Sequence, residues 1–294
     1  MALLVSYGYL PGTDITPSVG FMRELPNESL EFFTPGEWDE DLMLLDPDSD
    51  STLAESIGFS GAREAEEVET NWNSAPLSPS PYGYEARRSQ RIGDRIEISV
   101  GAFATAEADT AYIGVGRASS ETPRCRGMAK CWGVHRRSAQ AASPCLRTRA
   151  GTPLRSQPPA RRRGRLIGTE VEVSWTFDSA PVEGDQPEVL PLAGVRFESE
   201  VDDFGRAPAG VEYPVQLHPE HLLGTEITEL TMEVSYDDGA SWAVVPTTAT
   251  EQGATALLDH PDSDGFVSLR ASAVDAAGNS VDQTMLRSYQ ITTG

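Results

Sequence analysis

The three cysteines of the chain lie close to a histidine in the sequence, and together they could bind a metal ion. Cys125, Cys131, His135 and Cys145 offer three thiolates and an imidazole, which Zn²⁺ accepts as ligands. Their spacing, C-x5-C-x3-H-x9-C, lacks the short paired knuckles of structural zinc sites, and the arginines between them would oppose a dication. We therefore predict no metal at these residues. The alternatives are an arginine-rich RNA-binding arm and a disordered segment.

The four histidines are the candidates for acid–base chemistry. They are His135, His218, His221 and His260. A hydrolase needs a nucleophile beside such a base and an oxyanion hole, but none of the four lies in a glycine-flanked or motif-like setting. We predict loop or strand-edge positions for them, no catalytic residue, and a chain that is not an enzyme.

An acidic stretch, DPDSDS, begins like a calcium-binding loop. Its carboxylates Asp46, Asp48 and Asp50 occupy positions one, three and five of that pattern. The pattern then fails, because position six is Ser51 instead of glycine and position twelve is Ile57 instead of glutamate. We predict a solvated acidic loop, and neither a metal nor another cofactor is expected in this chain.

The stretch SYDDGASW, residues 235–242, fits the pattern S-x-D-x-G-x-S-W and resembles the Asp-box of sialidase-type propellers. It predicts a hairpin turn in which the carboxylate of Asp237 accepts amide hydrogen bonds and Gly239 adopts a positive φ. Trp242 is expected to pack under the hairpin as a buried aromatic side chain. Because one copy makes no propeller, we predict a structural turn at Ser235, Asp237, Gly239 and Trp242, and no ligand site.

The composition argues against several kinds of partner. The chain has 294 residues and a net charge of −22, and an acidic protein is repelled by nucleic acids and by anionic membranes. It contains no apolar run of about eighteen residues, so no membrane span is expected. Its first residues, MALLVSYGYL, lack the charged start of a signal peptide. We expect a monomer that binds no nucleic acid.

The charge is unevenly distributed along the chain. Residues 117–165 contain thirteen of the twenty-three basic residues, all three cysteines and one acidic residue, Glu121, whereas the remainder carries ten basic and forty-four acidic residues. The basic segment is rich in Pro and Ser and poor in large apolar residues, so it cannot bury enough surface to offset its conformational entropy. We predict that residues 117–165 form a disordered insert.

Alternating apolar residues predict β-strands on both sides of this insert. In residues 170–177 the apolar side chains that share one face are Val171, Val173, Trp175 and Phe177. The same period of two occurs in residues 95–100, 230–236 and 267–273, and a last strand is expected at 284–291. Turn residues separate these segments at DDG and DAAGN.

These patterns predict an all-β protein with two antiparallel β-sandwich modules of immunoglobulin-like or jelly-roll-like type. The first module is expected at residues 76–180, interrupted by the insert, and the second, immunoglobulin-like module at 181–294. Residues 178–189 are expected to link them. Because residues 188–294 have the length of an immunoglobulin-like domain, we expect them to fold alone.

The N-terminal segment, residues 1–75, has a different character. It is acidic, with Pro and Gly scattered through it and no sustained periodicity. A short helix is expected within residues 53–69, and the rest is expected to be a poorly ordered acidic lead.

Five strings outside the insert, taken in order, resemble one known family. They are TNWNSAPLSPSP, RIGDRIEISVGAF, GTEVEVSWTFDSA, MEVSYDDGASW and GFVSLRASAVDAAGNSVDQTMLRSY. Together they resemble the C-terminal, non-catalytic region of large secreted actinobacterial subtilisin-like serine peptidases. The resemblance covers residues 70–116 and 166–294, and residues 1–69 more weakly. The family's motifs around its catalytic Asp, His and Ser are absent from this chain, so the resemblance carries over no catalytic residue.

The resemblance also offers an explanation of the basic insert. Family members have a sequence like LYRDGEVLG at the position of the insert, and a shifted reading frame of the insert permits the sequence RDGEVLG. If each new codon takes the last base of one residue and the first two of the next, Met128 into Ala129 must give glycine. In the same frame Cys131 into Trp132 must give leucine, and Trp132 into Gly133 must give glycine.

A second family string returns in the same frame. Residues 142–157, ASPCLRTRAGTPLRSQ, permit FPVPADAGRYTFEVA, which matches the family's F-x-VPA string and the following strand. We predict that the segment is frameshifted, through a real lesion or a sequencing error, in which case its cysteines have no function. The alternative is a basic linker selected as such.

The resemblance implies a role without catalysis. We expect a C-terminal accessory fragment of a secreted subtilisin-like serine peptidase, whose β modules are structural or hold a protein substrate or a cell-surface component for the parent. As part of such a parent the chain would be extracellular. The alternative is an independent adhesive or carbohydrate-binding β-sandwich protein.

Overall fold

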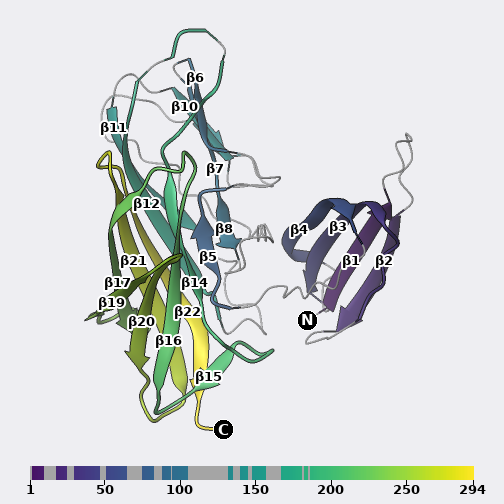
Figure 1. Ribbon diagram of the computed structural model, residues 1–294, viewed down its shortest axis with the longest axis vertical. Coiled ribbons are helices and arrows are strands. Elements are labelled where there is room, and N and C mark those ends of the chain that lie inside the picture. The colour runs from purple at the N-terminus through teal and green to yellow at the C-terminus, as the bar shows by residue number, and fades with distance from the viewer. Residues whose placement is uncertain are drawn as a thin grey trace.

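The computed structural model describes thirteen stretches of the 294 residues: 2–9, 18–24, 30–46, 51–64, 75–82, 88–93, 95–104, 132–134, 140–144, 148–156, 167–180, 182–184 and 186–294. Every regular element within these stretches is a β-strand, and nearly all the pairings are antiparallel. The predicted all-β class is therefore confirmed (Figure 1).

The N-terminal segment contains a four-stranded antiparallel sheet with the order β2-β1-β3-β4. Its strands are β1 Ala2–Tyr9, β2 Ser18–Glu24, β3 Gly36–Asp46 and β4 Ser51–Arg63. Two short apolar runs pair in it, with Leu3 opposite Leu44 and Val5 opposite Leu42. Averaging the composition over 1–75 hid these runs, so the expectation of a lead without regular structure is corrected.

The short helix expected within residues 53–69 is also corrected, because the chain from Ser51 to Arg63 is strand β4. Two glycines in this stretch, Gly58 and Gly61, weaken a helix. Pairing with β3 along most of its length supplies β4 with backbone hydrogen bonds instead. Of the calcium-loop residues, Asp46 ends β3 and Ser51 begins β4, and Asp48 and Asp50 lie outside the described residues.

The main body is a sandwich whose larger sheet has the order β11-β12-β22-β21-β17-β18, with β15 pairing β22 in parallel. Its strands are β11 Thr148–Ser156, β12 Glu170–Ser179, β15 Arg206–Pro208, β17 Ile227–Ser235, β18 Ala243–Val245, β21 Gly265–Asp275 and β22 Ser280–Thr292. The predicted strands at 170–177, 230–236, 267–273 and 284–291 correspond to β12, β17, β21 and β22.

The opposing sheet has the order β14-β16-β20-β19. Its strands are β14 Ala193–Glu198, β16 Glu212–His221, β19 Thr247–Thr250 and β20 Gly253–Asp259. Two smaller sheets complete the fold, one with the order β13-β6-β7-β10-β9 and one of β5 and β8. Their strands are β5 Ser78–Ser80, β6 Gln90–Ile92, β7 Arg95–Ser99, β8 Gly101–Ala104, β9 Trp132–Val134, β10 Gln140–Pro144 and β13 Glu188–Val189.

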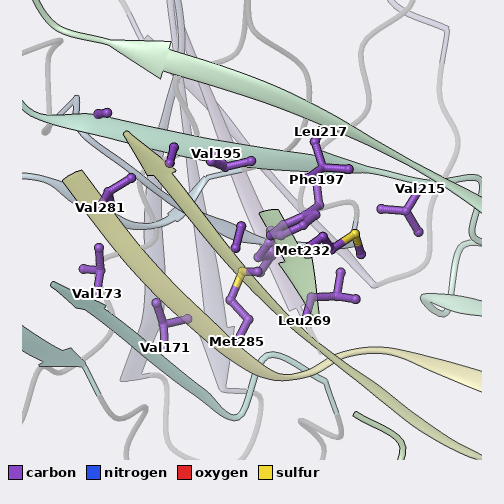
Figure 2. Close-up of a cluster of buried hydrophobic side chains, with 14 of the residues drawn as sticks. Val171, Val173, Val195, Phe197, Val215, Leu217, Met232, Leu269, Val281 and Met285 are labelled. Atoms are coloured by element: carbon purple, nitrogen blue, oxygen red, sulfur yellow. The ribbon is translucent and has the colours of Figure 1, made fainter. Parts of the chain in front are cut away.

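The core lies between the two large sheets and is made by the apolar face of each strand (Figure 2). The alternation predicted for β12 and β21 is present as alternating burial, and Met232 and Val234 on β17 are also buried. Figure 2 shows Val171, Val173, Val281, Met285, Leu269 and Met232 from the larger sheet gathered with Val195, Phe197, Val215 and Leu217 from the opposing one.

The module boundary expected near residue 180 does not separate two sheets. Strand β12, assigned to the first module, pairs with β22 of the second from Glu170 opposite Leu286 to Thr176 opposite Ser280. Leu77, Ile98 and other buried residues of the first module belong to the same core cluster as the C-terminal strands. The assignment of β12 to the first module was wrong because pairing between distant segments leaves no local signal in the sequence.

The insert contains strands where we expected disorder. Within residues 117–165, β10 pairs β7 and β11 pairs β12 over nine register positions, and β9 pairs β10. Both β7 and β12 would otherwise present unpaired backbone groups, and an extended segment of almost any composition can pair with them. The zinc candidates Cys125, Cys131, His135 and Cys145 lie outside the described residues.

Candidate functional site

The Asp-box-like turn connects β17 to β18 and is held by a network of short hydrogen bonds. The hydroxyl of Ser235 donates to Oδ1 of Asp237 at 2.7 Å, and its Oγ accepts the backbone N–H of Gly239 at 2.9 Å. Ser235 is buried at the end of β17, so this anchor is fixed by the core strand. The turn expected at these residues is formed.

The carboxylate of Asp237 is the centre of the turn. Its Oδ1 accepts the backbone N–H of Ser241 at 2.8 Å, and its Oδ2 accepts the Ser241 hydroxyl at 2.6 Å. These bonds from Ser241, together with that from Ser235, lower the pKa of Asp237 to about 2. Both carboxylate oxygens are thus engaged inside the turn, which is the structural role that the sequence predicted.

The turn requires backbone that favours glycine. Asp238 has a φ of 57° and Gly239 a φ of 83°. A Cβ on Gly239 would lie 2.9 Å from Cδ2 of Leu286 and 3.3 Å from the ring of Trp242. Asp238 in turn accepts two hydrogen bonds from Arg287 on β22, at 2.8 and 2.6 Å. The turn is therefore fastened to the outer surface of the neighbouring hairpin.

Trp242 lies on this outer surface and is half-buried, which corrects the expected burial under the hairpin. Its Nε1–H donates to the carbonyl oxygen of Gly239 at 3.1 Å. The guanidinium of Arg270 stacks over the ring, 4.1 Å from its centroid, and also pairs with Glu233 at 3.2 Å. The indole has a polar N–H and a cation above it, so the solvent-facing side of the sheet suits it better than the apolar core.

A second carboxylate-centred turn joins β21 to β22. Oδ1 of Asp275 accepts the backbone N–H groups of Ala277 and Asn279, each at 2.8 Å, and Oδ2 accepts the Asn279 side-chain amide at 2.7 Å. Burial opposes ionisation of Asp275, but the bonds from Asn279, Ala277 and His221 lower its pKa overall. The stretch DAAGN indicated a turn, but not that its aspartate organises it.

His221 completes that turn. Its Nε2 lies 3.1 Å from Oδ2 of Asp275, and both side chains are almost completely buried. Its Nδ1 accepts the backbone N–H groups of Leu223 at 3.1 Å and Thr225 at 3.3 Å, so Nε2 carries the proton and donates to Asp275. An imidazole–carboxylate pair also occurs in serine hydrolases. In this chain, however, the second ring nitrogen, Nδ1, accepts two backbone N–H groups and is therefore not available to a nucleophile.

His260 lies in a buried aromatic cluster at the opposite end of the sandwich from that turn. Its ring stacks on Tyr213 with 4.7 Å between centroids, and Tyr236 and Tyr289 lie at 6.2 and 5.7 Å. Nδ1 is 2.8 Å from the carbonyl oxygen of Pro208, and Nε2 is 3.0 Å from the Tyr289 hydroxyl. The carbonyl can only accept, so Nδ1–H donates to it and Nε2 accepts from Tyr289.

Burial sets the protonation state of this cluster. Desolvation lowers the pKa of His260 below its ordinary value, and it raises the pKa of Tyr213 and of Tyr236 to about 12. All three groups are therefore neutral at pH 7. The cluster connects β15, β16 and β22 with the residues that directly follow β17 and β20, and its hydrogen bonds stabilise this end of the sandwich.

The remaining described histidine, His218, pairs with Glu198 across the β14–β16 ladder at 2.7 Å on the surface. Within the described residues, no group of three or more His, Cys, Asp or Glu side chains is placed to hold a metal ion. The same residues include no helix long and apolar enough to cross a membrane.

Comparison with known proteins adds no assignment. The sequence matches no protein-family model and no curated protein.

Proposed function

We propose that this chain is a non-catalytic accessory segment of a secreted subtilisin-like serine peptidase, in which a β-sandwich holds a protein substrate or a cell-surface component near the catalytic domain. The observation that carries the proposal is the placement of the resembling strings. Those at 168–180, 232–242 and 265–289 fall on β12, on β17 with its turn, and on β21 with β22. These strands are neighbours in a single sheet.

That placement matters because the three strings are far apart in the sequence. Strings that resembled the family by chance would not be expected to fall on strands that pair with one another. The pairing of β12 with β22 and of β22 with β21 instead makes the resembling strings one continuous surface and core. This supports a comparison with one folded module of the family.

The described histidines support a role without catalysis. His221 and His260 each use both ring nitrogens in hydrogen bonds that stabilise the fold, and Nε2 of His218 lies 2.7 Å from a carboxylate oxygen of Glu198 at the surface. A general base needs a ring nitrogen free to take a proton from a nucleophile. We therefore expect purified chain to leave casein intact and to show no specific labelling by a serine-directed fluorophosphonate probe. Labelling of a single serine would contradict the proposal.

The proposal includes a frameshifted insert, and the register of β11 supports that part. Positions 152, 154 and 156 lie directly opposite Trp175, Val173 and Val171, whose side chains are all buried. In the shifted frame the string RYTFEVA places tyrosine, phenylalanine and valine at these three positions. In antiparallel strands, residues directly opposite one another share a face. The residues encoded in the shifted frame would thus give β11 an apolar face on the same side of the sheet as the apolar face of β12.

The binding role has its own test, separate from the parentage. A screen of the full chain against a glycan array addresses the alternative of a carbohydrate-binding module. We expect no glycan to bind, since the half-buried Trp242 has Arg270 over its ring and offers no free aromatic platform there. Saturable binding of one glycan class, lost in Trp242→Ala, would favour the alternative.

A further inference from the structure

The loop of residues 222–226 connects β16 to β17, and a buried imidazole fixes its backbone. His221 is the last residue of β16, and its Nδ1 accepts the backbone N–H groups of Leu223 at 3.1 Å and of Thr225 at 3.3 Å. Gly224, which lies between them, has a φ of 66° and donates its N–H to the His221 carbonyl at 3.0 Å. One residue therefore supplies the acceptors for three successive amide groups of the loop.

The other attachments of this loop lie at its two ends. Leu222 is buried, and its N–H donates to the Leu192 carbonyl at 3.0 Å. The carbonyl of Glu226 accepts the N–H of Ala276 at 2.9 Å. Between these ends, Leu223 is 54% exposed, so the amide groups in the middle of the loop can bond to water when they leave the imidazole.

The second ring nitrogen of His221 determines where a further proton can be added. Nε2 lies 3.1 Å from Oδ2 of Asp275 and carries the proton of the neutral ring, because Nδ1 accepts two N–H groups. A second proton can therefore be added only at Nδ1. There it would face two N–H donors, and none of these groups can accept. The imidazolium and the present conformation of the loop exclude one another.

Asp275 is the charged group that the described structure places against the ring. It lies in the turn between β21 and β22, and burial opposes its ionisation, but its hydrogen bonds lower its pKa overall. It is therefore ionised throughout the range in which an imidazole titrates. Because it bonds to Nε2, it stabilises an imidazolium without providing an acceptor for Nδ1.

The other described elements beside His221 bring an uncharged residue or a carboxylate that lies elsewhere. On β14, Ala193 is directly opposite His221. Glu220, the preceding residue of β16, points to the other face of the strand and pairs with Arg196 at 2.7 Å. The loop itself contributes Glu226, which is exposed. Protonation of the ring is thus favoured by the carboxylate at Nε2 and opposed by the loop at Nδ1.

We propose that the loop of residues 222–226 is a pH-dependent element, closed on the neutral His221 ring and released when Nδ1 takes up a proton. On release, the N–H groups of Leu223 and Thr225 bond to water, and the imidazolium keeps its bond to Asp275. The loop and the proton compete for one lone pair, so each weakens the binding of the other. This inference does not depend on the proposed parentage of the chain.

The test measures backbone amide exchange by NMR in the full chain, labelled with ¹⁵N, at pH 7.5 and pH 5.5. An imidazole with the ordinary pKa of about 6.5 in the open loop would raise the open population about tenfold between these two pH values. The protection factors of Leu223 and Thr225, corrected for the intrinsic effect of pH on exchange, should therefore fall about tenfold. The ¹⁵N chemical shifts of the His221 ring should show a neutral ring protonated at Nε2 at pH 7.5.

Two variants separate the proton from the hydrogen bonds. In His221→Asn, the side-chain oxygen takes the place of Nδ1 and accepts N–H groups but does not titrate, so the protection of both amides should no longer depend on pH. His260→Gln removes the other buried histidine and should leave the response of the loop unchanged. Thermal melts establish that each variant is folded.

The measurement on the unsubstituted chain can overturn the proposal without any variant. It does so if Leu223 and Thr225 are equally protected at pH 7.5 and pH 5.5, or if the neutral ring of His221 carries its proton on Nδ1. The proposal is also overturned if the pH response persists in His221→Asn or disappears in His260→Gln, since another group would then be responsible.

Discussion

At the scale of single residues, substituting the glycines of the two carboxylate-centred turns distinguishes the cost of backbone strain from the cost of a steric clash. Gly239 and Gly278 have the same φ of 83°, but an added Cβ meets Leu286 at 2.9 Å only at Gly239, and nothing within 4 Å at Gly278. We expect Gly278→Ala to cost about 1 kcal/mol, the backbone term alone, and Gly239→Ala to cost about 2 kcal/mol or more. Urea melts of both variants measure the difference, and equal losses would show that Leu286 yields without cost.

Trp242 stabilises the outer surface of the larger sheet rather than its core. Its half-burial and the cation over its ring give an expected loss of about 1–3 kcal/mol for Trp242→Ala. Phe197→Ala, at a fully buried position, should cost about 3–5 kcal/mol. Val244→Ala, at an exposed position, should change little. A loss at Trp242 as large as at Phe197 would place the indole in the core after all.

His260 makes stability depend on pH in a defined window. Its folded-state pKa lies below the ordinary value of 6.5, so the unfolded chain binds a proton before the folded one does. Its contribution is therefore full above about pH 6.5 and is lost as pH falls toward the folded pKa. The lowered pKa values of Asp237 and Asp275 act only below their ordinary value of 3.8. Urea midpoints between pH 7.5 and pH 5 measure the loss of stability in this window.

The control for this pH dependence removes the titrating group. His260→Gln should lower stability at pH 7.5 and flatten the loss between pH 7.5 and pH 5. His218→Gln, at a surface position, should leave the slope contributed by His260 in place. An unchanged slope in His260→Gln would mean that another group titrates in the window.

The sequence supported the residue roles unevenly. The spacing S-x-D-x-G-x-S-W was sufficient for Ser235, Asp237 and Gly239, because the hydrogen bonds that Ser235 and Asp237 make in the turn lie within eight residues of sequence. The burial of Trp242 was predicted wrongly because its neighbour Arg270 lies on β21, which is distant from Trp242 in the sequence. The aromatic cluster of His260 was missed for the same reason, as its members come from separate strands.

At the scale of elements, β12 decides which segment can fold by itself. The four alternating residues Val171, Val173, Trp175 and Phe177 are all buried, and β12 pairs with β22. A fragment of residues 188–294 loses this strand and leaves β22 with an open edge. We expect 167–294 to unfold at a higher urea concentration than 188–294, and more cooperatively. Equal midpoints would restore the module boundary that the sequence suggested.

Element identity was largely readable from the sequence, and element pairing was not. Alternation located β12, β17, β21 and β22, because period two is a local property of a half-buried strand. The pairing of β12 with β22 joins segments that lie more than a hundred residues apart, with Leu286 opposite Glu170. In the N-terminal segment, the averaged acidic composition concealed the apolar runs of β1 and β3.

At the scale of the whole molecule, the proposed frameshift relates the charge distribution to the fold. Residues 75–104 and 167–294 contribute to one hydrophobic core. Between these two segments in the sequence, the composition changes abruptly from acidic to basic. Under the proposal, the strand over 148–156 keeps its pairing with β12 but has lost the apolar text that the shifted frame contains. The segment would then be a substitute for the original strand.

The genomic sequence of the locus, read upstream of codon 1 and across codons 117–166 in several independent isolates, distinguishes a frameshifted peptidase fragment from an independent protein. We expect an open frame encoding a subtilisin-like catalytic domain upstream. We also expect a one- or two-base change near codon 117 with a compensating change near codon 166. No peptidase frame upstream, together with the same intact basic frame in every isolate, would contradict the proposed frameshifted fragment.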